Sequence, residues 1–287
     1  MSAGMSGKEK KTKVLVADDD QSVRLLLGEL LDKAGYTVTV VPDGVAAIAQ
    51  IRKKPFDLVM LDVHMPGMGG LEVLQKLKDL GRRSKVIIMT ADNTPETLLQ
   101  AVREQADRYV PKPFRTQALL ELVNETLEER PPATPIEVVS ARPHWVELVV
   151  PCERPVADRI QGFMMALKAD LPDEVRNAVG DAFREMLLNA IEWGGKLDPT
   201  RKVRISYLRA QRMLMYRIAD PGAGFHFEGL EHAAISNPPE DPIRHMRVRD
   251  EKGLRAGGFG ILMTQQKVDE VLYNEKQNEV VLIKYLD

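Results

Sequence analysis

The feature that most constrains this chain is a regular alternation of short apolar runs and amphipathic segments over its first 129 residues. Between residues 21 and 34, for example, apolar side chains recur every three or four positions, which is the spacing of a helix with one buried face. The pattern predicts strands at 14–17, 37–41, 57–61, 85–89 and 108–110, and helices at 21–34, 43–53, 69–80, 95–105 and 115–129. Strands that alternate with helices in this way predict an α/β fold, a five-stranded, doubly wound parallel sheet with helices on both faces.

Three prolines within residues 131–135 end this pattern, because proline cannot continue a helix. We therefore predict a first domain over 13–129, a linker over 130–144 and a second domain over 145–287. The second domain is expected to contain helices at 154–169 and 173–193, strands at 203–207 and 213–219, an irregular stretch to about 257, a helix from 260 and a hairpin of 269–274 and 279–286. Long helices combined with antiparallel strands predict an α+β sandwich.

Composition excludes several functional classes. The chain has 40 Lys and Arg against 42 Asp and Glu, whereas a nucleic-acid-binding protein normally carries a basic excess. A single cysteine, Cys152, excludes an internal disulfide and fits a reducing compartment. No apolar run approaches the roughly 18–20 residues that a membrane span needs, and the polar, basic N-terminus does not resemble a secretory signal. We expect a soluble, cytoplasmic protein that contacts neither nucleic acid nor membrane directly.

Polar side chains follow the predicted strands of the first domain. Asp18 and Asp19 follow the first strand, Asp62 the third, Thr90 the fourth and Lys112 the fifth. The carboxyl ends of parallel strands meet at one edge of a sheet, so three carboxylates converge there and repel one another unless a divalent cation lies among them. Mg²⁺ suits such oxygen ligands and leaves room for a phosphoryl group, which predicts an aspartyl-phosphate site. The alternative for the acidic triplet alone is a turn and helix cap.

Four segments make residues 13–129 resemble a response-regulator receiver domain, which has the flavodoxin-like fold. They are VADD at 16–19, LDVHMPGM at 61–68, MTA at 89–91 and YVPKPF at 109–114. One departure is Gly69, where the family more often has Asp.

The resemblance to receiver domains assigns a role to each polar residue. It implies that Asp62 is the phosphoacceptor and a metal ligand, and that Asp19 binds the metal directly and Asp18 through water. It also implies that the backbone carbonyl of His64 completes the protein ligands. Thr90 and Lys112 would bind the phosphoryl group, Tyr109 would act as an aromatic switch, and the peptide between Lys112 and Pro113 would be cis. An upstream sensor histidine kinase would be the phosphodonor.

The helix predicted at 173–193 has one polar face. Asp181, Glu185, Asn189 and Glu192 share it, which places Glu185 and Asn189 one turn apart. The Asn189 side chain offers a carbonyl oxygen suited to Mg²⁺, and Glu185 is a candidate general base. The alternative is a solvated polar face without a ligand.

Two glycine-containing segments follow this helix. Gly222 and Gly224, next to Asp220, let the backbone approach a flat ligand, and an Asp can accept a hydrogen bond from an exocyclic amine such as that of adenine. An ordinary turn is the alternative. Gly258 and Gly260 open a helix, whose free amides and dipole suit phosphates. The sequence contains no GxxxxGK[ST] motif, so a P-loop is excluded.

In this order, the three segments make residues 145–287 resemble the ATP-binding (Bergerat) fold shared by histidine kinases, gyrase, Hsp90 and the anti-sigma serine kinases. Residues 185–192 resemble the N-box, 220–224 the G1 box and 258–260 the G2 box, and 226–256 would form the ATP lid. The resemblance implies ATP and Mg²⁺ as cofactors, with Asn189 holding the metal and Asp220 and the four glycines binding ATP. An arginine near the γ-phosphate is common just before the G2 glycines, and Arg255 matches it only with a shift of one residue.

The resemblance is closest to the anti-sigma serine kinases, because a histidine kinase would need a dimerising helical hairpin with an exposed histidine. It implies a two-component response regulator, phosphorylated on Asp62, that controls an ATP-dependent serine kinase with Glu185 as its base. The target would be an anti-sigma antagonist of the STAS type, or a sigma factor that the domain holds. The alternative is a non-catalytic ATP-binding module that sequesters a partner under control of the receiver. A homodimer through the 154–193 helices is also compatible with the sequence.

Overall fold

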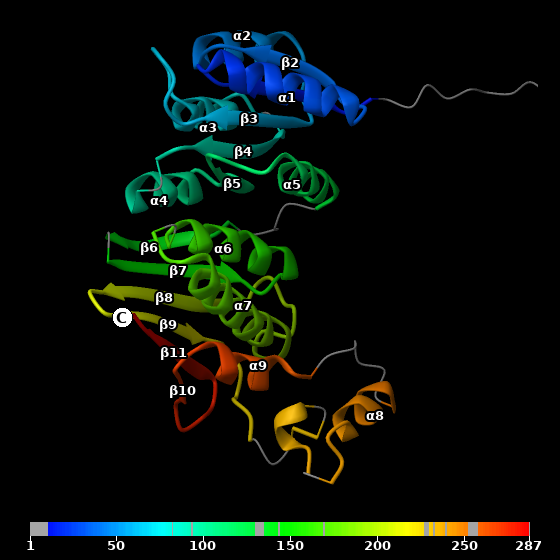
Figure 1. Cartoon of the computed structure of the whole chain (residues 1–287), viewed down its shortest axis with the longest axis vertical. Coiled ribbons are helices and arrows are strands. Elements are labelled where there is room, and N and C mark those ends of the chain that lie inside the picture. The colour runs from blue at the N-terminus through cyan, green and yellow to red at the C-terminus, as the bar shows by residue number, and fades with distance from the viewer. Residues whose placement is uncertain are drawn as a thin grey trace, which may run out of the picture. The chain divides into compact units, whose positions relative to one another are not determined.

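The computed structural model describes residues 11–286 except 82, 93, 130–134, 143, 169, 227–229, 232, 239 and 252–257. The chain forms two compact units (Figure 1). The first comprises the residues up to 92 together with 106–129, and the second comprises 93–105 together with 130–287. Among the described residues, none of the helices combines the length and the hydropathy that crossing a membrane requires.

The first unit is built on a parallel sheet whose five strands lie in the order β2-β1-β3-β4-β5. These strands are β1 (Lys13–Ala17), β2 (Thr37–Val41), β3 (Leu58–Asp62), β4 (Lys85–Thr90) and β5 (Arg108–Pro111). Its helices are α1 (Gln21–Lys33), α2 (Gly44–Lys53), α3 (Gly70–Asp79) and α5 (Thr116–Glu128). The strand order reverses between β1 and β3, which is where ligands bind in open parallel sheets. The predicted α/β fold is confirmed.

The parallel strands of the first unit belong to a well-packed apolar core. Every residue of β3 is buried, as is expected for a parallel strand covered on both faces. From α1, Leu27 and Leu31 pack into the same core and are fully buried, and each such leucine stabilises the fold by about 1.5–3 kcal/mol. This packing fixes the carboxyl ends of the strands, and therefore the backbone of the polar residues that follow them.

Helix α4 (Pro95–Arg103) follows β4 in the chain but groups with the second unit, where it packs against β6 (Glu137–Arg142). Gln105, just after α4, fixes this packing through its side-chain amide. Its Nε2 donates to the carbonyl oxygen of Ile136 at 3.0 Å, and its Oε1 accepts from the amide of Ile136 at 3.3 Å. Ile136 is buried, so this amide pair is shielded from water.

The second unit contains an antiparallel sheet of six strands in the order β10-β11-β9-β8-β7-β6. Besides β6, these are β7 (Trp145–Pro151), β8 (Lys202–Ala210), β9 (Met213–Ala219), β10 (Glu270–Tyr273) and β11 (Glu279–Tyr285). Helices α6 (Arg154–Ala166) and α7 (Asp173–Asn189) cover one face of this sheet, as Figure 1 shows. Helix α9 (Gly260–Lys267) packs against α7. The predicted α+β class is confirmed.

The prediction of a linker over 130–144 is wrong for the part that forms β6, which pairs with β7. β6 is an edge strand with weak alternation, and its Val139 is 47% exposed, so its sequence lacks the signal of a buried strand. β7 alternates clearly, because Val146, Leu148 and Val150 all point into the core. Our sequence analysis passed over this second strand as well.

Helix α7 is shorter than predicted and continues as a π-helical turn from Ala190 to Gly194. Two glycines allow the chain to pass closely here. A Cβ on Gly194 would lie 2.1 Å from Asp220 Oδ1, and one on Gly195 would lie 2.1 Å from Cys152 Sγ. In the stretch predicted to be irregular, the chain forms helix α8 (Arg244–Glu251).

Candidate functional site

Three carboxylates gather at the ends of β1 and β3. Asp18, Asp19 and Asp62 each offer one oxygen, and these three oxygens lie within 4.8 Å of one another. Asp18 is fully buried and Asp62 is 5% exposed, whereas Asp19 faces solvent. Lys112, from the end of β5, places its Nζ 2.7 Å from Asp18 Oδ2 and 3.3 Å from Asp62 Oδ2. The structure thus brings together the four charged residues that the strand ends predict.

The charges of this cluster do not balance. Burial raises the pKa of Asp62; the ammonium of Lys112 opposes the shift, and the neighbouring carboxylates of Asp18 and Asp19 add to it. Two buried carboxylates and the exposed one of Asp19 lie around a single ammonium, and this excess of negative charge is one that a divalent cation offsets. Clustered carboxylate oxygens are the donor set that Mg²⁺ prefers, so these residues fit that ion.

Asp92 connects the other residues of the predicted phosphorylation site. Its backbone amide donates to Thr90 Oγ1 at 2.9 Å, and its carbonyl oxygen accepts from the Tyr109 hydroxyl at 2.7 Å. Its carboxylate lies 3.2 Å from His64 Nε2. The sequence analysis did not single out Asp92, although its place two residues after Thr90 was a signal. The Lys112–Pro113 peptide is cis, as the resemblance implies.

Close backbone packing after Asp62 explains the unusual Gly69. A Cβ at Gly69 would lie 2.6 Å from the carbonyl oxygen of Val63, and one at Gly70 would lie 2.2 Å from that of Asp62. An aspartate at position 69 would therefore require this loop to move.

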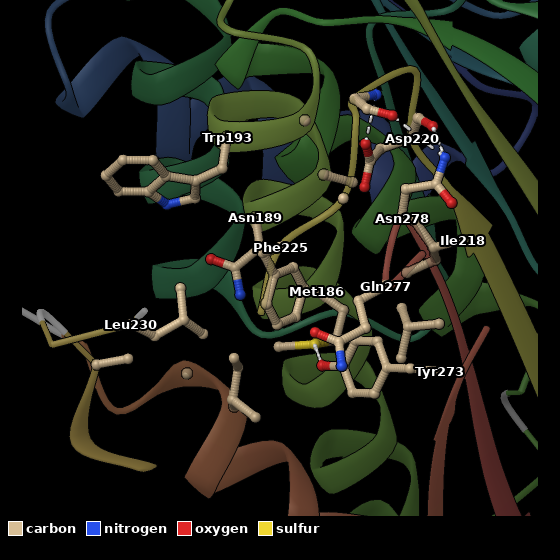
Figure 2. Close-up of a pocket in the computed structure, with 18 of the residues that line it drawn as sticks. Met186, Asn189, Trp193, Ile218, Asp220, Phe225, Leu230, Tyr273, Gln277 and Asn278 are labelled. Carbon is tan, nitrogen blue, oxygen red and sulfur yellow. Dashed lines mark hydrogen bonds between the residues drawn. The ribbon is translucent and has the colours of Figure 1, made fainter. Parts of the chain in front are cut away.

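The second unit contains a pocket of 670 Å³ (Figure 2). It is lined by all the described residues that we predict to bind ATP or act on it, namely Glu185, Asn189, Asp220, Gly222, Gly224, Gly258 and Gly260. Arg255 lies outside the described residues. The roles of these residues stay predictions, but the structure places them around one space.

One end of the pocket is formed by Asp220 and the loop after it. Asp220 Oδ1 accepts a hydrogen bond from the amide of Gly222 at 2.7 Å. Burial raises the pKa of Asp220, and the Gly222 amide opposes this shift. The side-chain amide of Asn278 donates to the carbonyl oxygen of Gly222 at 3.3 Å. Asp220 is therefore a fixed acceptor, suited to the exocyclic amine of a base.

The N-terminus of α9 lies against the polar face of α7. A Cβ on Gly260 would lie 2.8 Å from Glu185 Oε2 and 3.7 Å from Asn189 Nδ2. The first amides of a helix lack partners within the helix and attract anions. A carboxylate, a side-chain amide and a helix N-terminus thus meet in one place, which suits the phosphates of a nucleotide and their metal ion.

Several pocket residues were missed by the sequence analysis. Trp193 comes from the π-helical turn and is 47% exposed at the pocket (Figure 2). Phe225 and Tyr273 pack edge to face with ring centres 5.6 Å apart. Arg249 of α8 also lines the pocket, although we expected no regular structure there. Trp193 lies one helical turn after Asn189, so the polar face of α7 contained a usable signal.

Two protein-family models match separate parts of the chain. The model described as the response regulator receiver domain matches residues 14–124, and the model described as the histidine kinase-like ATPase domain matches residues 154–284. The chain is a receiver domain fused to a histidine kinase-like ATPase domain. The predicted resemblance of the first domain to receiver domains, and of the second to histidine kinase-like ATPases, is therefore confirmed. The ATPase model describes the family as a whole and does not identify the anti-sigma branch.

Curated relatives show similarity to part of the chain. It is 29% identical over 184 residues to the sensory/regulatory protein RpfC of Xanthomonas campestris, a match of 61% of this chain and 25% of RpfC. It is 34% identical over 130 residues to the response regulator MprA of Mycobacterium bovis, a match of 45% of this chain and 56% of MprA. The chain therefore spans about a quarter of the first relative and just over half of the second.

Solved structures of receiver domains also match. A CheY-like receiver domain protein of Methanospirillum hungatei is 29% identical, with a TM-score of 0.40, and the match covers 41% of this chain and 94% of that protein. The response regulator TrrA of Thermotoga maritima is 34% identical, with a TM-score of 0.37, and the match covers 40% of this chain and 98% of TrrA.

Proposed function

We propose that this protein is a two-component response regulator whose ATPase domain is an ATP-dependent serine kinase of the anti-sigma type. An upstream sensor histidine kinase phosphorylates Asp62, and the ATPase domain then phosphorylates a serine of an anti-sigma antagonist. The observation that carries the proposal is the position of Glu185 beside Asn189, where the N-terminus of α9 meets α7. That arrangement supplies a base next to a site for the phosphates.

In the first step, a carboxylate oxygen of Asp62 attacks the phosphorus of the donor's phosphohistidine, and the bond from phosphorus to nitrogen breaks. Asp18, Asp19 and Asp62 would hold Mg²⁺, which supplies charge neutralisation when bound. Lys112, already 3.3 Å from Asp62 Oδ2, pairs with the new phosphoryl oxygens, and the buried Thr90 hydroxyl donates to another. The phosphoryl group carries about −1.5 to −2 of charge and replaces a single carboxylate charge, so the negative charge of the cluster increases.

The segment between Thr90 and Tyr109 supports control of the second domain. Both residues belong to the first unit, whereas α4, which connects them in sequence, groups with the second unit. A shift of Thr90 toward the phosphoryl group would act through Asp92, which bonds both Thr90 and Tyr109. The amide pair of Gln105 and Ile136 then transmits the change to the edge of the sheet.

In the second step, the oxygen of a serine hydroxyl attacks the γ-phosphorus of ATP. The bond to the bridging oxygen breaks, ADP leaves and the hydroxyl proton passes to Glu185. Asn189 would hold Mg²⁺ through its side-chain oxygen, and the first amides of α9 would hold phosphate oxygens. Asp220 would anchor the base at the other end of the pocket.

Calorimetric titration with Mg-ATP tests the proposed nucleotide site. We expect wild-type protein to bind and Asn189→Ala to lose roughly tenfold or more in affinity, because an oxygen ligand of the metal is removed. Asn177→Ala, an exposed position on the same helix, should bind like wild type. Beryllofluoride, which mimics the phosphoryl group, should change the wild-type affinity but leave Asp62→Asn unaffected. If wild type does not bind Mg-ATP, the ATPase domain is a scaffold and the proposal is wrong.

Glu185→Gln separates the kinase from the non-catalytic sequestering module. The amide cannot take the hydroxyl proton, so phosphoserine formation on a STAS-type antagonist of the same organism should slow by about 10²-fold or more, while Mg-ATP affinity changes little. Glu174→Gln, an exposed change on the same helix, is the control. Equal transfer rates for Glu185→Gln and wild type would remove Glu185 from the mechanism. If wild type binds the antagonist but never phosphorylates it, the sequestering module is the better account.

A further inference from the structure

β6 forms one edge of the antiparallel sheet, and the side of β6 away from β7 has no neighbouring strand. Among the described residues, no backbone hydrogen bond reaches Glu137–Arg142 from that side. The side chains of Glu137 and Arg142, at the two ends of the strand, are both exposed. An edge strand with unpaired amides and carbonyls is a template for pairing with another strand.

A β-bulge in β6 places its two charged ends on the same face of the sheet. The register of β6 on β7 shifts by one residue at the centre of the strand. Glu137 pairs with Val149 and Arg142 pairs with Trp145, and these partners are four residues apart on β7, so they share a face. In a regular strand, positions 137 and 142 would point to opposite faces. The extra residue of the bulge brings them to the same face.

β6 is therefore complementary to a second copy of itself in the antiparallel direction. Glu137 of each copy would lie opposite Arg142 of the other, and Val138 would lie opposite Ala141. Val138 and Ala141 both pair with buried residues of β7, so they share the core face of the sheet. Opposite charges directly across a strand pair stabilise it. Neither Glu137 nor Arg142 forms an ion pair with another described residue.

Gln105 and helix α4 cover this edge in the structure. Both belong to the second unit together with β6, and α4 packs against β6. The side-chain amide of Gln105 bonds both backbone groups of Ile136, the residue just before β6, as a residue of a neighbouring strand would. Gln105 has a φ of 56°, in the left-handed region that favours glycine. The cover thus depends on a residue in an unfavourable conformation.

We propose that the outer edge of β6 is an interface between two copies of this chain, paired antiparallel through Glu137–Arg142, and that α4 and Gln105 close it. Pairing joins the two six-stranded sheets into one. The cover and the second copy compete for the same edge, so the chain dimerises when α4 leaves β6. This inference does not depend on the nucleotide site or on kinase activity, and it adds a partner to the proposed function.

Gln105→Gly tests the cover. Glycine adopts the left-handed conformation without strain, so the variant removes the amide pair and keeps the backbone. Sedimentation equilibrium on the full chain measures the dissociation constant of the dimer. We expect Gln105→Gly to self-associate about tenfold more tightly than wild type, because the closed state loses two hydrogen bonds. Gln211→Gly, at an exposed turn between β8 and β9, should behave like wild type. If Gln105→Gly associates no more tightly than wild type, the proposal is wrong.

Exchange of the charges at the ends of β6 tests the interface itself, in the Gln105→Gly background. Glu137→Arg places arginine opposite arginine, and Arg142→Glu places glutamate opposite glutamate, so each variant alone should self-associate about tenfold more weakly. An equimolar mixture of the two variants should recover the parent affinity, because every arginine then lies opposite a glutamate. Glu275→Arg, in the exposed turn between β10 and β11, is the control and should change nothing.

Recovery in the mixture also shows that both charge variants are folded. A dimer formed through α6 and α7 would keep its affinity in each variant, and that result would overturn the pairing through β6. A mixture that associates no more tightly than the separate variants would overturn it as well. Calorimetry with Mg-ATP on the same samples reports on the nucleotide site separately, so a failure of this inference is distinguishable from a failure of the proposed function.

Discussion

Gly224→Ala is expected to lower the affinity for Mg-ATP by roughly 100-fold or more, which corresponds to about 3 kcal/mol. Gly224 has a φ of 87°, and a Cβ there would lie 1.5 Å from the carbonyl oxygen of Lys276. The left-handed conformation alone costs alanine about 1–2 kcal/mol. The overlap with a backbone atom adds to this, because the loop after Asp220 must separate from the turn that carries Gln277. Calorimetry with Mg-ATP measures the loss.

Gly162→Ala provides the matched control for this change. Gly162 lies within α6, and a Cβ there would meet nothing within 4 Å. Alanine should therefore stabilise the helix by up to about 1 kcal/mol and leave ATP affinity unchanged. If Gly224→Ala bound ATP as well as Gly162→Ala does, the contact between the loop and the turn would not be needed for the pocket.

Lys168→Met is expected to stabilise the second unit by about 3 kcal/mol at pH 8 and by about 2 kcal/mol at pH 9. Lys168 follows α6 and is fully buried, and its Nζ has no hydrogen-bond partner among the described residues. The Nζ lies 5.1 Å from the centre of the Tyr216 ring. Burial lowers the pKa of Lys168 to about 7, and the nearby Arg176 lowers it further.

The sign of the pH dependence follows from this lowered pKa. Between pH 7 and the ordinary lysine value of 10.5, the unfolded chain binds a proton at Lys168 that the folded chain has lost. Folding therefore releases that proton, so the free energy of unfolding of the wild-type protein rises by about 1.4 kcal/mol per pH unit in this window. Methionine has no proton to release and fills the same space with an apolar chain. The gain from Lys168→Met should shrink as the pH rises.

Urea unfolding between pH 7 and 9.5 measures this effect by tryptophan fluorescence. Both tryptophans of the chain, Trp145 and Trp193, belong to the second unit, so the signal does not mix the two transitions. Lys276→Met, at an exposed position of the same unit, should change stability by less than about 0.5 kcal/mol. A difference between wild type and Lys168→Met that does not vary with pH would mean that Lys168 stays charged in the folded state.

The fold of the first unit could be predicted because three of its strands, β1, β3 and β4, are mainly apolar runs that each lead into a polar residue. The rule that parallel strands place their carboxyl ends together was sufficient to bring Asp18, Asp62 and Lys112 into one cluster. The architecture of the second unit followed from the spacing of its helices and strands. Its edge strand β6 could not be predicted in this way, because a half-exposed edge strand shows no clear apolar face in the sequence.

The remaining pocket residues depend on contacts between distant parts of the chain. Gln277 enters the pocket because Asn278 pairs with Asp220, and that pairing comes from the register of β11 on β9. No local pattern marks a glutamine that adopts the left-handed conformation. The grouping of α4 with the second unit is similar, since it comes from the packing of α4 against β6, which the amide pair of Gln105 and Ile136 accompanies. Sequence periodicity reports on buried faces and does not report on such pairings.

The packing of Cys152 against Gly195 has a practical consequence for studies of this protein in solution. Burial raises the pKa of this thiol to about 11, so almost no thiolate forms at neutral pH, and the thiolate is the species that maleimides and other sulfhydryl reagents attack. The sequence contains no other cysteine. A pair of cysteines introduced at exposed positions, one in each unit, would therefore accept spin labels without removal of a native residue. The distance between the two units could then be followed as Asp62 is phosphorylated.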